Sequence, residues 1–242
     1  MPRYRDVQVS FGPPLTWVVR QLIIVTAAIF LLTYLPAVMF DWNLPFALFG
    51  LRPFDVTHRL FFWQPFTYLF LHAGFFHVIF NLFALWMFGS ELERLWGPGR
   101  FLFYFFLTGV GAAVFDVILQ PSATSTTIGN SGAVYGVLLA YGLLFPERPI
   151  YLWLLVPVKA KWFALIIGLI EFTSSFSNPG SKVSHIAHLG GMLFGLLYLR
   201  GGGLPYRLQL RYHEWRRARL RRKFEVFMRK HESKDESGRW IH

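Results

Sequence analysis

Apolar segments recur six times along the chain, separated by short polar or proline-containing stretches. A continuous apolar run of about 20 residues is long enough to span a membrane as a helix, and an isolated strand cannot satisfy its backbone in lipid. The first run is also longer than the apolar core of a cleaved signal peptide, about 7–15 residues. The pattern therefore predicts an all-α membrane protein with six transmembrane helices. We expect the helices at 21–38, 77–90, 101–119, 131–146, 163–172 (extended upstream by 151–158) and 185–199.

The composition agrees with a membrane protein and excludes several other classes. Hydrophobic residues make up 54% of the 242 residues and charged residues only 15%, against about 25% charged in soluble domains. The chain has no cysteine. A disulfide framework, a thiol nucleophile and a cysteine-liganded metal site are therefore excluded.

The basic residues predict the orientation of the helices. A net charge of +11 would suggest a nucleic-acid partner in a soluble chain. With six helices, however, 21 of the 24 Lys and Arg residues fall on one predicted side of the membrane, and Arg52, Arg59 and Lys182 fall on the other. Basic loops remain in the cytoplasm. We therefore expect cytoplasmic termini, a multi-pass position in a cell membrane, lipid as a partner, and no nucleic acid.

The ends of the chain differ from its middle. We expect a cytoplasmic segment at 1–15, a transmembrane domain at 16–203 and a basic cytoplasmic tail at 204–242. In the tail, Leu220, Phe224 and Phe227 follow a helical period among arginines. This pattern fits either an amphipathic helix on anionic lipid or a solvated tail, and both interpretations stay open.

Polar residues inside the second, fourth and sixth segments gather at one predicted depth. A polar side chain in a membrane helix is costly and therefore needs an explanation. Residues four apart share a helix face, so His77 points with Asn81, and Ser131 points with Tyr135. With His188, they all fall in the first turns after the chain enters from the outer side. The coincidence predicts one shared polar site.

Glycine pairs predict that the fourth and sixth helices approach each other closely. Gly132 and Gly136 lie in one helix, and Gly191 and Gly195 in the other, both with small-xxx-small spacing. If these faces meet, a serine hydroxyl can come within the hydrogen-bond distance, about 2.6–3.2 Å, at which an imidazole base activates it.

The start of the fourth helix supplies further parts of a hydrolytic site. Ser131 follows Gly129 and Asn130, so unpaired backbone N–H groups and the positive helix end lie at the hydroxyl. Together with the side chains of His77 and Asn81, they can stabilise a tetrahedral oxyanion.

The base has no evident acidic partner in the sequence. These stretches contain neither Asp nor Glu, so we infer a dyad of Ser131 and His188, with the Tyr135 ring holding the imidazole. Glu171, near the end of the fifth segment, is interpreted as a water-facing residue at a helix end. His185 is interpreted as a residue at the rim of the site.

Three motifs in order resemble the rhomboid family of intramembrane serine proteases. The first is His72-Ala-Gly-Phe-Phe-His77-Val-Ile-Phe-Asn81, the second is Gly129-Asn130-Ser131-Gly132, and the third is Ala187-His188-Leu189-Gly190-Gly191 with Gly195. Glu93-Arg94 before Gly97 resembles the acidic–basic pair that closes the family's second helix. The resemblance covers about residues 15–200.

The resemblance implies a role for each matched residue. Ser131 would be the nucleophile, His188 the base, His77 and Asn81 oxyanion donors, and Tyr135 a packing partner of the base. The substrates would be transmembrane segments of other proteins, cleaved near the outer face of a bacterial inner membrane without a cofactor or metal. The first loop, about 41–64, would be the family's lateral, half-embedded loop.

Other functions weigh less. A metal enzyme built on His72, His77, His185 and His188 lacks both an HExxH motif and a carboxylate beside its histidine pairs, and His72 is interpreted as structural. A catalytically silent adaptor that binds transmembrane segments, or a transporter of the same architecture, would be expected to lack the nucleophile or the base. A soluble esterase is excluded because Ala133 breaks the GxSxG pattern.

Overall fold

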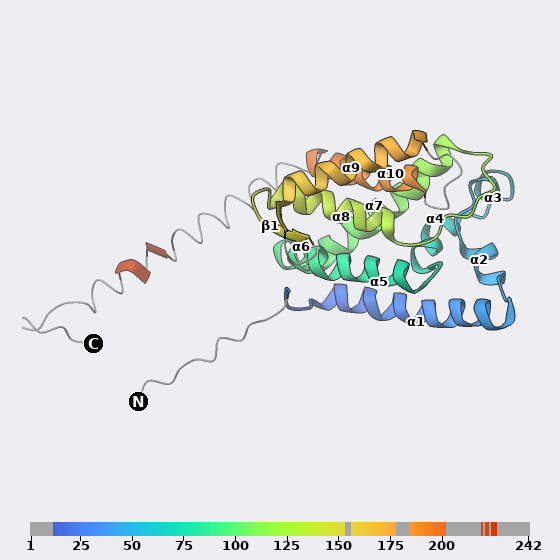
Figure 1. Cartoon of the computed structure of the whole chain (residues 1–242), viewed down its shortest axis with the longest axis horizontal. Coiled ribbons are helices and arrows are strands. Elements are labelled where there is room, and N and C mark those ends of the chain that lie inside the picture. The colour runs from blue at the N-terminus through green and yellow to red at the C-terminus, as the bar shows by residue number, and fades with distance from the viewer. Residues whose placement is uncertain are drawn as a thin grey trace, which may run out of the picture. The chain divides into compact units, whose positions relative to one another are not determined.

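The computed structural model describes residues 12–152, 156–177, 184–201, 219, 221, 222 and 224–226 of the 242. The chain divides into two compact units, 1–197 and 198–242. The first unit is mainly a bundle of helices (Figure 1).

Long helices fall close to the predicted segments. They are α1 (Trp17–Phe40), α5 (Phe75–Ala84) continuing through a π-helical turn η2 (Leu85–Gly89) into α6 (Ser90–Trp96), α7 (Pro98–Leu119), α8 (Ser131–Leu144), α9 (Ala160–Ser177) and α10 (His185–Gly201). Four short helices occupy the first connection: α2 (Leu44–Phe49), α3 (Pro53–His58), α4 (Gln64–Thr67) and η1 (Tyr68–Phe70).

Within the described residues, three helices are long and apolar enough to cross a membrane. They are α1, the continuous helix Phe75–Trp96, and α7. The next helix, α8, is apolar but has only 14 residues, while α9 and α10 have 18 and 17. The six predicted segments are therefore all helical, and three of them have the length and hydropathy of membrane spans.

The expected upstream extension of the fifth segment is wrong. Residues 149–152 and 156–159 form a two-stranded antiparallel sheet, β1 (Pro149–Leu152) and β2 (Val156–Lys159), in which Ile150 pairs with Val158. Proline lacks the N–H that a helix interior requires, and Pro149 and Pro157 both lie in this stretch. The protein is therefore mostly helical rather than all-α.

An ion-pair cluster closes the base of this hairpin. Lys159 Nζ lies 2.8 Å from a carboxylate oxygen of Glu147, and Lys161 pairs with the other oxygen. Hydrogen bonds from these two lysines lower the pKa of Glu147 to about 2, so this carboxylate stays anionic at neutral pH.

Much of the predicted amphipathic tail lies outside the described residues, including Leu220 and Phe227. The described tail residues 219, 221, 222 and 224–226 are helical, and their side chains are exposed.

The short helix α8 lies at the centre of the first unit. Ten of its 14 residues are buried, and it contacts α5, η2, α6, α7 and α9. Its small residues let these neighbours approach, so the N-terminus of α8 is enclosed by other helices.

The predicted close approach of α8 and α10 is confirmed at one glycine pair. A methyl group on Gly191 would lie 1.9 Å from the carbonyl oxygen of Gly132. The other two glycines pack on α7 instead. A methyl on Gly136 would meet Thr108 at 2.6 Å, and one on Gly195 would meet the Tyr104 hydroxyl at 2.4 Å. Glycine thus brings the first turn of α8 against the second turn of α10.

A buried carboxylate anchors α1 to the bundle. Glu93 accepts hydrogen bonds from the backbone N–H groups of Val18 and Val19, both at 3.0 Å, and from the Thr16 hydroxyl. The first N–H groups of a helix have no partner within it. Glu93 therefore satisfies the start of α1 from a neighbouring helix.

We expect Gly191→Ala to destabilise the protein by about 1–3 kcal/mol or more, because the new methyl overlaps backbone that cannot rotate away. Gly99→Ala is the matched control, since a methyl there meets nothing within 4 Å. Thermal unfolding in detergent should show a midpoint several degrees lower for Gly191→Ala and no loss for Gly99→Ala. Equal midpoints for the two variants would contradict the close approach.

Candidate active site

Ser131 begins α8 at the end of a well-anchored connection. Leu51 and Thr127 exchange two backbone hydrogen bonds of 2.8 and 2.9 Å, and the N–H of Gly129 donates to the Tyr68 carbonyl at 2.9 Å. Gly129 has φ +111°, a conformation that favours glycine. The turn therefore presents Ser131 at the positive end of a helix.

The imidazole of His188 lies against this serine. Its Nε2 is 2.8 Å from Ser131 Oγ. On one side, the ring stacks on Tyr135, with centroids 4.2 Å apart and planes inclined by 10°. Because Gly132 follows Ser131 directly and touches Gly191, three residues after His188, the backbones are close enough for this hydrogen bond.

His77 and Asn81 reach the same place from α5. A methyl group on Gly129 would lie 2.8 Å from the His77 ring and 3.8 Å from Asn81 Nδ2. Both side chains thus face the peptide that precedes Ser131. His72 is fully buried behind them, and its ring meets that of His77 at 4.9 Å. The structure brings together all the polar residues that the sequence analysis assigned to one depth.

The interpretation of Glu171 as water-facing is wrong. Its side chain is buried, and Oε2 lies 2.9 Å from His188 Nδ1. The other carboxylate oxygen accepts a hydrogen bond from the Tyr135 hydroxyl. A carboxylate therefore does stand beside the imidazole, which the sequence analysis did not expect. It comes from α9, a helix that carries none of the three motifs.

His185 is also placed differently from expectation. Its Nδ1 lies 2.7 Å from Glu171 Oε2, and its side chain is only 17% exposed. It is thus a partner of the buried carboxylate rather than a free rim residue. One of the two arguments against a metal enzyme, besides the missing HExxH motif, is that no carboxylate accompanies the histidine pairs. That premise fails, since one carboxylate oxygen and two imidazole nitrogens lie within 4.8 Å of one another.

Asp116 of α7 is a second buried carboxylate at this end of the bundle, and sequence reasoning missed it. It accepts hydrogen bonds from Ser184 at 3.1 Å, Thr127 at 3.2 Å and Gln120 at 2.9 Å. It ties the connection before α8 to the residue before α10. An acidic residue inside an apolar segment was the available signal.

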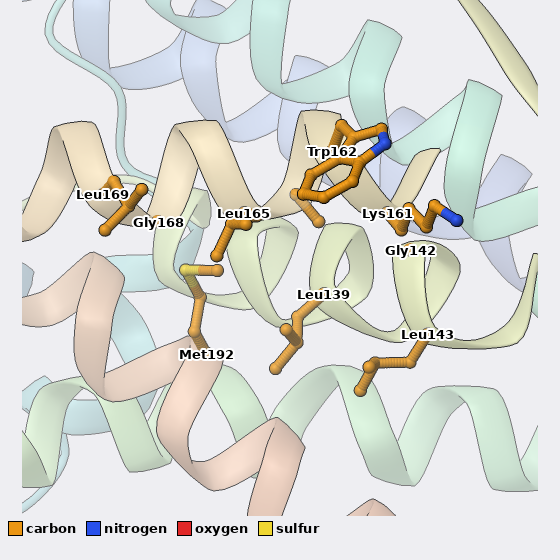
Figure 2. A pocket seen from close by; sticks show the side chains of 10 residues that line it. Leu139, Gly142, Leu143, Lys161, Trp162, Leu165, Gly168, Leu169 and Met192 are labelled. Carbon is orange, nitrogen blue, oxygen red and sulfur yellow. The ribbon is translucent and has the colours of Figure 1, made fainter. Parts of the chain in front are cut away.

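A separate cavity of about 390 Å³ lies between α8, α9 and α10 (Figure 2). Its lining is apolar apart from Lys161, with Leu139, Trp162 and Met192 among the side chains that surround it. It opens along the second half of α8, away from Ser131. The cavity therefore adds no reactive group to the site.

The arrangement has the parts of a hydrolytic centre. A hydroxyl contacts one imidazole nitrogen, and a carboxylate contacts the other, which fixes a hydrogen on Nδ1 and leaves the Nε2 lone pair toward the serine. Donors for a developing oxyanion surround the helix N-terminus.

A comparison with protein families matches residues 60–202 to the Rhomboid domain. This match covers more than half of the chain and includes every residue of the site. The chain therefore belongs to the rhomboid family. Together with its apolar helices, this membership identifies a multi-pass membrane protein.

Several curated proteins are similar over this region. The Rhomboid protease GluP of Bacillus subtilis is 30% identical over 59% of this chain and 26% of its own length. The Putative rhomboid protease YdcA of the same organism is 30% identical over 56% of this chain and 64% of its own. Rhomboid protein 1, mitochondrial, of Saccharomyces cerevisiae is 27% identical over 53% of this chain and 38% of its own length. The chain thus spans between a quarter and two thirds of the length of these relatives.

We expect Ser131 to react with an alkyl fluorophosphonate, because Nε2 of His188 accepts the hydroxyl proton. His188→Ala should slow the second-order rate constant by about 100-fold or more, and Glu171→Gln by about tenfold or more. Ser175→Ala on α9 is the control, since among the described residues its hydroxyl bonds to the Phe172 carbonyl of its own helix. Mass spectrometry of the labelled protein measures the rates. An unchanged rate in His188→Ala would contradict the assignment.

Proposed function

We propose that this chain is an intramembrane serine endopeptidase that cleaves transmembrane segments of other membrane proteins near the outer face of a bacterial inner membrane. The observation that carries the proposal is the 2.8 Å contact between Ser131 Oγ and His188 Nε2 at a helix N-terminus inside an apolar bundle. If Ser131 only capped the N-terminus of α8, its hydroxyl would not need a histidine from another helix as a partner.

In the acylation step, His188 Nε2 accepts the proton of Ser131 while Oγ attacks a substrate carbonyl. The first intrahelical N–H of α8 to donate is that of Val134, to Asn130. By helix geometry, the N–H groups before it have no acceptor within α8. These groups, with His77 and Asn81, stabilise the oxyanion, and the imidazolium then protonates the leaving amine.

In the deacylation step, water from the outer side attacks the acyl-enzyme. His188 takes a proton from this water and returns it to Ser131, which restores the starting state. Neither a metal nor a nucleotide takes part in the two steps.

Glu171 and Tyr135 orient the base. The stacked Tyr135 ring fixes the plane of the imidazole, and Glu171 accepts the hydrogen of Nδ1. A carboxylate in this position stabilises the imidazolium that forms in each step. We therefore extend the Ser–His dyad by one positioning carboxylate supplied by α9.

The membrane arrangement follows from length and charge. We propose six spans in a domain of residues 16–203, with the segment 1–15 and the tail 204–242 in the cytoplasm. The connection 41–64 then lies on the outer side. Its exposed Trp42, Phe62 and Trp63 suit the membrane interface, and substrates enter sideways between this connection and α9.

We expect the purified protein to cleave a model transmembrane substrate in detergent, and Ser131→Ala and His188→Ala to lose this cleavage, about 10³-fold or more. His185→Ala should retain measurable activity, since its ring does not contact Ser131. Cleavage products are resolved by gel electrophoresis and mass spectrometry. Undiminished cleavage by Ser131→Ala would refute the mechanism, and binding without cleavage by the wild type would favour a silent adaptor.

The absence of cysteine allows a clean test of orientation, because any single-cysteine variant carries one reactive thiol. Asn43 and Glu147 are both exposed and fall on opposite sides of the proposed membrane. In intact spheroplasts, a membrane-impermeant maleimide should label Asn43→Cys and leave Glu147→Cys unlabelled until the membrane is disrupted. The reverse pattern would overturn the proposed topology.

A further inference from the structure

Three potential metal ligands converge on the side of His188 that faces away from Ser131. Glu171 Oε2 lies 2.7 Å from Nδ1 of His185 and 2.9 Å from Nδ1 of His188. One ligand atom from each of the three residues lies within 4.8 Å of the other two. The two histidines are three residues apart and thus share a face of α10. Glu171 completes the set from α9.

Two imidazoles and one carboxylate form a donor set that suits a borderline cation. Zn²⁺ takes three such protein ligands and leaves a fourth position for water, while Mg²⁺ and Ca²⁺ prefer oxygen ligands alone. Glu171 and His188 are buried, and the partly exposed His185 offers a route of entry. Small movements of the side chains would replace two hydrogen bonds by three metal bonds.

We propose that Glu171, His185 and His188 form a Zn²⁺ site whose occupation switches off Ser131. This inference rests on the proposed function, because it concerns the regulation of that same site. The cation is an inhibitor here and takes no part in peptide hydrolysis.

The inhibition follows because Zn²⁺ and Ser131 contact the two different nitrogens of the His188 imidazole. A neutral imidazole carries one hydrogen, which sits on Nδ1 while Nε2 accepts from Ser131. Zn²⁺ bonds through the lone pair of a nitrogen. Its binding at Nδ1 therefore moves the hydrogen to Nε2, with no net proton released from the ring. Nε2 then donates to Ser131 Oγ and can no longer take its proton.

The first test measures binding without activity. Protein in detergent is stripped with EDTA, exchanged into metal-free buffer and titrated with Zn²⁺, and bound metal is counted after gel filtration. Ser131→Ala should bind one Zn²⁺ per chain like the wild type, because Ser131 is not a ligand. His185→Ala and Glu171→Gln should weaken binding by about tenfold or more. His58→Ala, which removes an exposed histidine outside the cluster, is the matched control and should bind normally.

The second test measures cleavage by the metal-free protein against added cation. We expect Zn²⁺ at micromolar concentrations to inhibit the wild type and His58→Ala, EDTA to reverse this, and Mg²⁺ or Ca²⁺ at the same concentrations to have no effect. His185→Ala should cleave the substrate measurably. It should need a Zn²⁺ concentration at least about tenfold higher than the wild type for the same inhibition. The unfolding midpoint of each variant shows whether it has kept its fold. If His185→Ala has lost its fold, Glu171→Gln replaces it as the ligand variant.

Three results would overturn the proposal. They are a wild type that binds no Zn²⁺, a His185→Ala variant inhibited at the same concentration as the wild type, and a metal-free wild type that gains activity on Zn²⁺ addition. A wild type that binds Zn²⁺ through these ligands but never cleaves would instead refute the proposed function and leave the metal site intact.

Discussion

The close contact of α8 and α10 at Gly132 and Gly191 is the constraint on which the rest of the site depends. A methyl on Gly191 would lie only 1.9 Å from the Gly132 carbonyl oxygen, so no larger residue fits between these backbones. Association of membrane helices relies on such packing, since lipid is as apolar as the side chains. Beside it, the same contact allows the 2.8 Å distance between Ser131 Oγ and His188 Nε2. The serine–histidine contact is thus a consequence of backbone packing.

The two buried carboxylates near this contact, Glu171 and Asp116, are both satisfied by polar groups around them. Glu171 accepts from Tyr135 and lies within hydrogen-bond distance of His185 and His188, which links three helices. Asp116 does the same for the connection before α8 and the start of α10. An unpaired polar group in an apolar interior is costly. The hydrogen bonds that remove this cost also hold each side chain in one orientation, which a reactive centre requires.

The apolar segments and the motif residues could be predicted because they depend only on the hydropathy and spacing of residues near one another in the sequence. The six helices, the start of α8 at Ser131 and the gathering of His77, Ser131 and His188 at one place follow from hydropathy and spacing along one chain. The strands at 149–152 and 156–159 were misread because their residues are mostly apolar, whereas their prolines and their pairing oppose a helix. Glu171 was misread because a carboxylate near a helix end is usually solvated, and only the position of α9 buries it.

Membership of the rhomboid family was therefore determined by the sequence itself, since three motifs in order carry it and the matched region 60–202 contains them all. Only the tertiary structure decided that His188 has a carboxylate partner and that His185 shares it. These contacts join α9 to α10 through side chains 14 and 17 residues apart, and no periodicity along a single helix encodes such a distance. The physical reason is that burial and pairing depend on which helices pack together, a property of the folded chain.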